Sequence, residues 1–199
     1  MVLAANTVNA ANPGILIFLS GMNGDTSVGP IAKGSNLGGG VTFNKTSFAY
    51  ANKLVLELHN YQGTATSCNS LESYLYGLGF DALNSTDPTI VNVMPVVMTE
   101  FGYDQDASGV DSIYATCLKS YLPSQQAGWM VWVLAGSYYI RSGIQDYDDT
   151  WGETRPDRNQ YRKILADFRI GILNHNWSDY RNATVFKEGV GAMISASLS

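Results

Sequence analysis

Four short apolar runs, separated by segments that include helix-forming stretches, constrain the fold of this chain most. They span residues 14–21, 53–61, 94–102 and 128–136. Each run has the length of a strand, is almost continuously apolar and is bounded by Gly, Pro or Asn, which is typical of strands buried on both faces. Strands that alternate with helices predict a parallel sheet with right-handed crossover connections.

Two segments between these runs carry a helical pattern. Residues 68–78 place three leucines at positions i, i+4 and i+7, and Gly79 follows as a C-cap. Residues 111–122 place Ile, Cys and Tyr four residues apart, and we expect Pro123 to end that helix. The stretch from 24 to 40 is rich in Gly, Ser, Asn and Thr, and it predicts a long loop.

Polar and aromatic side chains gather at or near the carboxyl ends of the later runs. His59 and Tyr61 end the second run, Glu100 ends the third, and Trp132 lies in the fourth. In a (β/α)8 barrel the active site is built at this rim. One consistent choice of strand faces points all four side chains into the same interior. An ionised Glu, held by a hydrogen bond from Tyr61 and flanked by an aromatic platform, is suited to attack an anomeric carbon.

Each of these residues also has a purely structural interpretation. Glu100 could cap the helix that follows it, and His59 could be a hydrogen-bonded core histidine. Tyr61 and Trp132 could be packing residues. Glu57, deeper in the second run, is interpreted as a buried structural acid. The combination of residues carries the catalytic hypothesis more than any one member does.

Four segments, residues 54–61, 95–102, 128–139 and 145–152, resemble the cellulase family, glycoside hydrolase family 5, and look most like its fungal members. The resemblance implies an α/β fold, a partial (β/α)8 TIM barrel of approximately strands 5 to 8 with their helices. A helix at residues 6–12 would lead into strand 5. On this basis residues 1–199 form a single incomplete barrel, with an insertion at about 153–171 that has no counterpart in the family.

The resemblance also implies a function in glucan breakdown. It makes Glu100 the catalytic nucleophile, His59 and Tyr61 its active-site partners, and Trp132 a substrate-binding residue of a retaining β-1,4-glucanase. The substrate would be a β-linked glucan or oligosaccharide. No metal and no organic cofactor is expected, and no His, Cys and Asp set in the sequence has the spacing of metal ligands.

One departure from the family puts activity in doubt. The family's acid/base residue is the Glu of an Asn-Glu-Pro motif, and this sequence contains no such motif. Retaining hydrolysis needs two carboxylates, so the expected activity is weak or none. The alternative function is a non-catalytic carbohydrate-binding or secreted interaction protein derived from a glucanase.

The evidence on localisation is mixed. Cys68 and Cys117 could by themselves be a disulfide or two buried thiols, and the family resemblance implies that they pair. The resemblance also implies secretion, which four Asn-x-Ser/Thr sequons support mildly; these are at Asn44, Asn84, Asn176 and Asn182. Residues 1–11, however, have no basic residue and no apolar core of the length that a secretory signal needs.

Charge and hydropathy exclude other partners. The net charge of −5 and the absence of a basic stripe argue against nucleic acid. No apolar run reaches the ~18 residues of a membrane-spanning helix. Open sheet edges in an incomplete barrel predict self-association.

Overall fold

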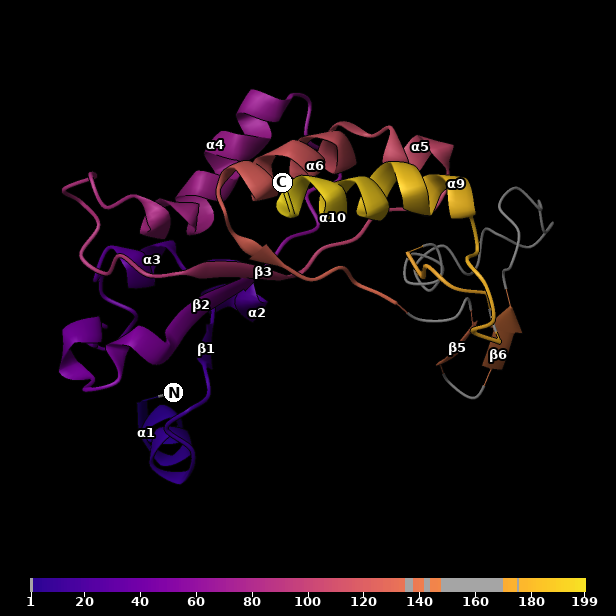
Figure 1. Cartoon of the computed structure of the whole chain (residues 1–199). Helices are drawn as coiled ribbons and strands as arrows, with labels where there is room; N and C mark the ends of the chain where they lie inside the picture. The colour runs from indigo at the N-terminus through magenta and orange to yellow at the C-terminus, as the bar shows by residue number, and fades with distance from the viewer. Residues whose placement is uncertain (1, 135–137, 142–143, 148–169, 175) are drawn as a thin grey trace. The chain divides into compact units, whose positions relative to one another are not determined.

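The computed structural model describes residues 2–134, 138–141, 144–147, 170–174 and 176–199 (Figure 1). The chain divides into two compact units. The first unit comprises Met1–Asn60, Asn69–Glu100 and Gln125–Met130. The second unit comprises Tyr61–Cys68, Phe101–Ser124 and Val131–Ser199. The predicted insertion lies largely outside the described residues, because 153–169 are not among them.

The first unit is an α/β arrangement around a sheet. Its helices are α1 (Val2–Ala11), α2 (Met22–Asp25), α3 (Gly29–Ala32) and α4 (Cys68–Leu78), with short η1 (Lys45–Ser47), η2 (Ala51–Lys53) and η3 (Phe80–Leu83). Its strands are β1 (Ile17–Ser20), β2 (Leu54–His59), β3 (Val96–Glu100) and β4 (Gly128–Trp129).

The four strands form one parallel sheet in the order β1-β2-β3-β4 (Figure 1). Each strand lies within one of the four apolar runs, so the predicted strands and their parallel arrangement are confirmed. Since sequential strands are neighbours in the sheet, all four carboxyl ends lie at one edge.

Burial along the strands follows the prediction in the sheet centre and departs from it at the edge. In β2 the residues from Leu54 to Leu56 and Leu58 are buried, as expected for a strand covered on both faces. In β1 the prediction is wrong, because Phe18 is 40% exposed. Among the described strands β1 pairs only with β2, and the face that carries Phe18 is not covered.

The fourth strand is shorter than its apolar run predicts. β4 ends at Trp129, and residues 132 and 133 lie in a turn. The backbone N–H of Met130 still donates to the carbonyl of Met98, 2.9 Å away. An uninterrupted apolar run does not indicate where the hydrogen bonds between strands end, so a buried strand and an apolar turn have the same pattern in the sequence. Residues 135 and 136 lie outside the described part of the chain.

The helix predictions are largely confirmed. α4 has the predicted bounds and buries Leu71 and Leu75. Gly79, with φ of +153°, closes α4 by donating its N–H to the carbonyls of Leu75 and Tyr76. The stretch predicted as one loop, residues 24–40, contains the short helix α3 and part of α2.

The second unit is built around α6. Its elements are α5 (Ala107–Val110), α6 (Ile113–Ser124), the antiparallel pair β5 (Tyr138–Arg141) and β6 (Ile144–Tyr147), then α9 (Ala183–Phe186), a π-helical turn η4 (Lys187–Gly191) and α10 (Ala192–Ser197). α6 lies beside α10 (Figure 1). Pro123 does not end α6 but occupies its last turn, because the next position, Ser124, still completes it.

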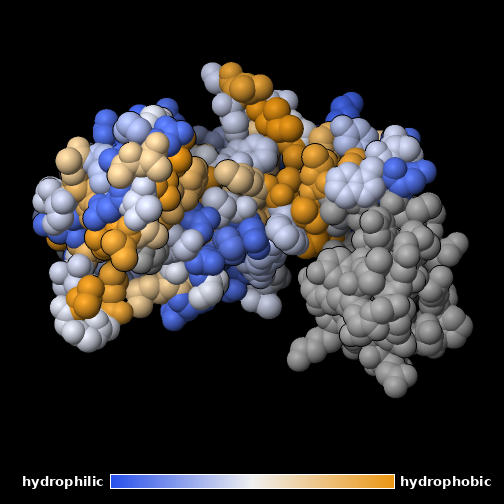
Figure 2. Space-filling model, turned by 90° about the horizontal axis from the view of Figure 1, so that it is seen from below, coloured by the Kyte–Doolittle hydropathy of each residue, from blue (hydrophilic) through white to orange (hydrophobic). Residues whose placement is uncertain are grey.

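Apolar side chains also reach the surface, where Figure 2 shows apolar areas among hydrophilic ones. In the first unit they include Val2, Leu3, Ile15, Leu16 and Phe18, all in or next to α1 and β1. Across the described residues, every helix is too short or too polar to cross a bilayer.

Candidate functional site

His59 and Glu100 occupy equivalent places in the sheet of the first unit. His59 is the last residue of β2, and Glu100 is the last residue of β3. The two are register partners, and Nδ1 of His59 lies 3.5 Å from Oε2 of Glu100. Their side chains are 22% and 28% exposed. The pair is therefore held by strands but open to a ligand.

A register shift brings these two side chains together. Glu57 pairs with Val97 and Leu58 pairs with Met98, but His59 pairs with Glu100, so the register shifts by one residue. Regular alternation would pair His59 with Thr99 and leave Glu100 on the opposite face, because a slip of one residue reverses every side chain. The irregularity thus re-aims a carboxylate at the end of the strand.

Glu57 lies one step deeper on β2 and is firmly held. The hydroxyl of Ser20 donates to its Oε1, and the hydroxyl of Thr99 donates to its Oε2 over 2.6 Å. Burial acts to raise the pKa of this carboxyl, but the two hydroxyl hydrogen bonds and the nearby His59 outweigh it, and the pKa falls below its usual value. Glu57 is only half buried, and its interpretation as a structural acid held by neighbouring strands remains a prediction.

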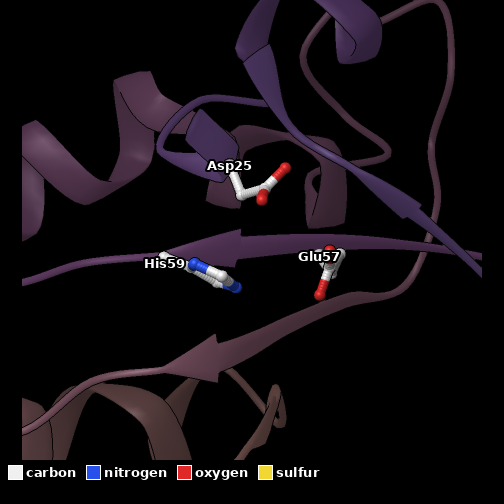
Figure 3. A group of neighbouring side chains, drawn as sticks. All are labelled: Asp25, Glu57 and His59. Atoms are coloured by element: carbon white, nitrogen blue, oxygen red, sulfur yellow. The ribbon is translucent and has the colours of Figure 1, made fainter. Parts of the chain in front are cut away.

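Asp25 joins Glu57 and His59 in a compact group (Figure 3). One possible ligand atom from each residue lies within 4.8 Å of the others, and all three residues are half buried. Two carboxylates and an imidazole could hold a divalent cation. Spacing in the sequence did not reveal this group, because Asp25 comes from the turn after β1 while the other two lie on β2. The Asn-Gly-Asp turn directly after an apolar run is the signal that could have found it.

Tyr61 and Trp132, the other two predicted site residues, belong to the second unit. They are 47% and 42% exposed, so neither is a core packing residue. The N–H of Trp132 donates to the carbonyl of Phe101 over 2.7 Å, and the peptide bond from Trp132 to Val133 is cis. The Trp132 carbonyl also sits against Gly102, where an added Cβ would approach it to 2.3 Å. Their roles in substrate binding remain predictions.

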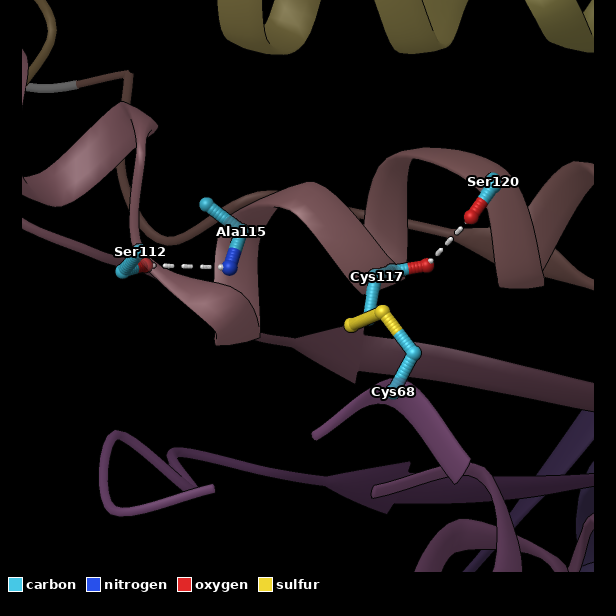
Figure 4. The surroundings of a disulfide bond; sticks show 5 residues. All are labelled: Cys68, Ser112, Ala115, Cys117 and Ser120. Carbon is cyan, nitrogen blue, oxygen red and sulfur yellow. Dashed lines mark hydrogen bonds between the residues drawn. A yellow bond between two sulfur atoms is a disulfide. The ribbon is translucent and has the colours of Figure 1, made fainter. Parts of the chain in front are cut away.

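Cys68, the first residue of α4, is the last residue of the segment Tyr61–Cys68 of the second unit, and it forms a disulfide with Cys117 of the same unit (Figure 4). Their Cα atoms are 5.3 Å apart, which is within the usual range for such a bridge. Cys117 is fully buried on α6, whose first turn is capped by the hydroxyl of Ser112, which accepts from the N–H of Ala115. Of the two alternatives left by the sequence, the disulfide is the one observed.

The described part of the site can supply an oriented carboxylate and an imidazole at the accessible carboxyl ends of β2 and β3. Glu100 can act as a nucleophile or a general base, and His59 can orient it or bind a substrate hydroxyl.

Comparisons with known proteins show similarity to a glycosyl hydrolase and to endocellulases. No family model matches the chain. A protein from Chamaecyparis obtusa described as "Glycosyl hydrolase 5 family protein" is 27% identical over 193 residues, which cover 89% of this chain. The chain spans only 28% of the length of that relative.

Solved structures show the same fold. The hyperthermophilic endocellulase from the archaeon Pyrococcus horikoshii matches over 97% of this chain and 46% of its own, with a TM-score of 0.52 and 13% identity. A structure of the same endocellulase in complex with cellotetraose matches over 96% of this chain and 46% of its own, again with a TM-score of 0.52 and 13% identity. The predicted resemblance to glycoside hydrolase family 5 and the partial TIM-barrel fold are thereby confirmed.

Proposed function

We propose that this chain supplies the nucleophile Glu100 to a retaining β-glucan hydrolase. The observation that carries the proposal is the position of Glu100 at the carboxyl end of β3, with Nδ1 of His59 3.5 Å from its Oε2. Strand ends of this kind are where TIM barrels hold catalytic residues. The similarity to a family 5 glycosyl hydrolase and to endocellulases, one of them bound to cellotetraose, supports a β-linked glucan as the substrate.

In the proposed reaction, Oε of Glu100 attacks the anomeric carbon and the glycosidic C–O bond breaks, which leaves a covalent glycosyl-enzyme that water then hydrolyses. His59 acts as a positioning residue that holds the carboxylate toward the sugar. For Trp132 the proposed role is stacking on the apolar face of a pyranose, and for Tyr61 it is donation of a hydrogen bond to the substrate.

Glu100 needs a second carboxylate about 5 Å away to protonate the leaving oxygen of a natural glycoside. The sequence has no Asn-Glu-Pro motif to supply it. General acid catalysis contributes about 10²–10⁴-fold. The chain by itself is therefore expected to cleave natural glucans slowly, and to act better on substrates whose leaving group needs no proton.

Hydrolysis of an aryl β-cellobioside with an acidic phenol as leaving group tests this proposal. The 199-residue chain is expected to release the phenol, and the Glu100→Gln variant is not. As a matched control, Glu188→Gln changes an exposed carboxylate of the second unit and should leave the rate unchanged. Equal release by the wild type and Glu100→Gln would remove Glu100 from the mechanism.

A second candidate function is glucan binding without catalysis. The exposure of Trp132 and Tyr61 favours it, because an accessible aromatic face can stack on a sugar whether or not an acid is present. Binding of a soluble glucan without release of reducing ends, and without release of an activated phenol, would select this alternative.

A further inference from the structure

Two of the four sequons share an exposed turn in which the sequon hydroxyl donates to the asparagine side chain. At Asn44 the side-chain Oδ1 accepts the N–H of Thr46 over 3.0 Å and its hydroxyl over 2.8 Å. At Asn176 the same atom accepts the hydroxyl of Ser178 over 2.7 Å. It also accepts the N–H of Ser178 over 3.3 Å, and this N–H is shared with Oδ1 of Asn174 at 3.0 Å. Both asparagines are exposed. In each case the hydroxyl required by the sequon already contacts the acceptor amide.

Asn182 satisfies the same three-letter pattern but folds differently. Its Oδ1 accepts the N–H of Val185 over 3.2 Å, and it serves as the N-cap of α9. Asn182 is half buried, and the structure gives its Oδ1 no hydrogen bond from the hydroxyl of Thr184. Both Asn44 and Asn182 therefore cap a helix, η1 and α9 respectively. The difference is that Asn44 accepts from the second residue after it, which is the sequon threonine, whereas Asn182 accepts from the third.

Asn84 lies between these cases. Its Oδ1 accepts the N–H and the hydroxyl of Thr86, at 3.0 and 2.7 Å. Its Nδ2, however, donates to the hydroxyl of Tyr76 over 3.0 Å, and Asn84 is half buried. Since the nitrogen is the atom that must react, Asn84 is not included in the proposal.

We propose that Asn44 and Asn176 are N-glycan acceptors and that Asn182 is not. The co-substrate is an oligosaccharide linked to a polyprenyl diphosphate, brought by a membrane-bound transferase. Nδ2 attacks C1 of the first sugar, the new N–C1 bond forms, the C1–O bond breaks, and the polyprenyl diphosphate leaves. Nδ2 gives one proton to a base of the transferase. Two hydrogen bonds on Oδ1 stabilise the negative charge that develops there as the proton leaves.

The turn is local in the sequence, so it is available before the chain has folded. Each turn closes between an asparagine and the residue two positions later, which is an Asx-turn. The helix cap at Asn182 is equally local. The disulfide between Cys68 and Cys117 is independently consistent with passage through an oxidising compartment, where such transferases act. The proposal does not depend on Glu100 or on catalysis.

The test is glycan occupancy of the full chain, secreted from a eukaryotic host behind an added leader. Peptide N-glycosidase in heavy-oxygen water converts each glycosylated Asn to labelled Asp, and mass spectrometry then reports occupancy site by site. We expect Asn44 and Asn176 to be occupied at least severalfold more than Asn182. A non-reducing peptide map that shows the cross-link from Cys68 to Cys117 checks that the secreted chain has folded.

Exchanging the middle residues of the Asn44 and Asn182 sequons separates the effect of local conformation from the effect of the tripeptide sequence. Ala183→Lys gives Asn182 the Asn-Lys-Thr tripeptide of Asn44, and Lys45→Ala gives Asn44 the Asn-Ala-Thr tripeptide of Asn182. If conformation decides, Asn44 stays occupied and Asn182 stays unoccupied in both variants. The proposal would be overturned by any of three results. These are occupancy that follows the exchanged tripeptide sequence, equal occupancy of Asn44 and Asn182, or no occupancy at Asn44 and Asn176.

Discussion

Nδ1 of His59 lies 3.5 Å from Oε2 of Glu100, although regular pairing of their strands would put the two side chains on opposite faces of the sheet. The register shift after Leu58 and Met98 removes that conflict. Irregularities of strand pairing are common next to active sites, where they change the face of the sheet to which a side chain points. The proposed function therefore depends on a register shift of one residue between β2 and β3.

Because Glu57 accepts two hydrogen bonds from hydroxyl groups, we predict that its carboxyl makes the free energy of unfolding depend on pH. Its pKa is lowered in the folded chain, so the carboxylate contributes stability above its ordinary pKa, and that contribution is lost as the pH falls through the lowered value. We expect the free energy of unfolding of the wild type to drop more steeply below about pH 5 than that of Glu57→Gln. Urea unfolding followed by circular dichroism at a series of pH values measures both slopes.

Glu188→Gln serves as the control for this experiment, because Glu188 is an exposed carboxylate on η4. Its slope should match that of the wild type. Identical slopes for the wild type and Glu57→Gln would contradict the account of Glu57.

The disulfide makes a prediction about stability. The bridge joins residues 49 positions apart, and a loop of that size stabilises the folded state by about 4 kcal/mol in the chain-entropy description. Reduction should therefore lower the urea midpoint of the wild type. A double variant, Cys68→Ala with Cys117→Ala, should start from the lower midpoint and show no response to reductant. A wild type whose midpoint ignores reductant would refute this prediction.

Much of the fold follows from the sequence because hydropathy and strand length act locally. The runs that contain β2 and β3 are apolar over the length of a buried strand, and α4 has leucines at helical spacing. The end of β4 could not be predicted, because Val131 to Leu134 remain apolar where the chain turns. The exposure of Phe18 could not be predicted either, since it depends on what covers β1.

The site was only partly predictable for a related reason. His59 and Glu100 could be proposed from their places at strand ends, but the shift that aligns them is a property of the pairing and has no signature in either strand. Asp25 was missed because it meets Glu57 and His59 only after β1 pairs with β2. Contacts of this kind are set by the sheet register, which periodicity alone does not determine.

The contact between Gly102 and Trp132 makes a prediction about ligand binding. A Cβ on Gly102 would lie 2.3 Å from the carbonyl oxygen of Trp132, so Gly102→Ala must displace the backbone that carries the indole. We expect the dissociation constant for cello-oligosaccharides, followed by tryptophan fluorescence, to rise several-fold. Gly63→Ala is the matched control in the same unit, because a Cβ there meets no atom within 4 Å. Equal effects of the two variants would argue against this coupling.

Trp132 itself makes a further prediction. If its indole stacks on a sugar ring, Trp132→Ala should weaken cello-oligosaccharide binding about tenfold, or about 1.4 kcal/mol. Trp177→Ala removes another exposed indole of the second unit, 55% exposed, and should leave affinity unchanged. Isothermal titration of both variants measures the difference, and a larger loss in Trp177→Ala would place sugar binding elsewhere.

The central claim is that Glu100 is a nucleophile, and covalent trapping tests it most directly. The full chain is incubated with a dinitrophenyl 2-deoxy-2-fluoro-β-cellobioside, whose leaving group needs no acid and whose fluorine slows hydrolysis of the intermediate. The account predicts one fluoro-cellobiosyl group per chain, found by peptide mapping on Glu100 and absent from Glu100→Gln. A chain that stays unlabelled, or a label on any other residue, would contradict it.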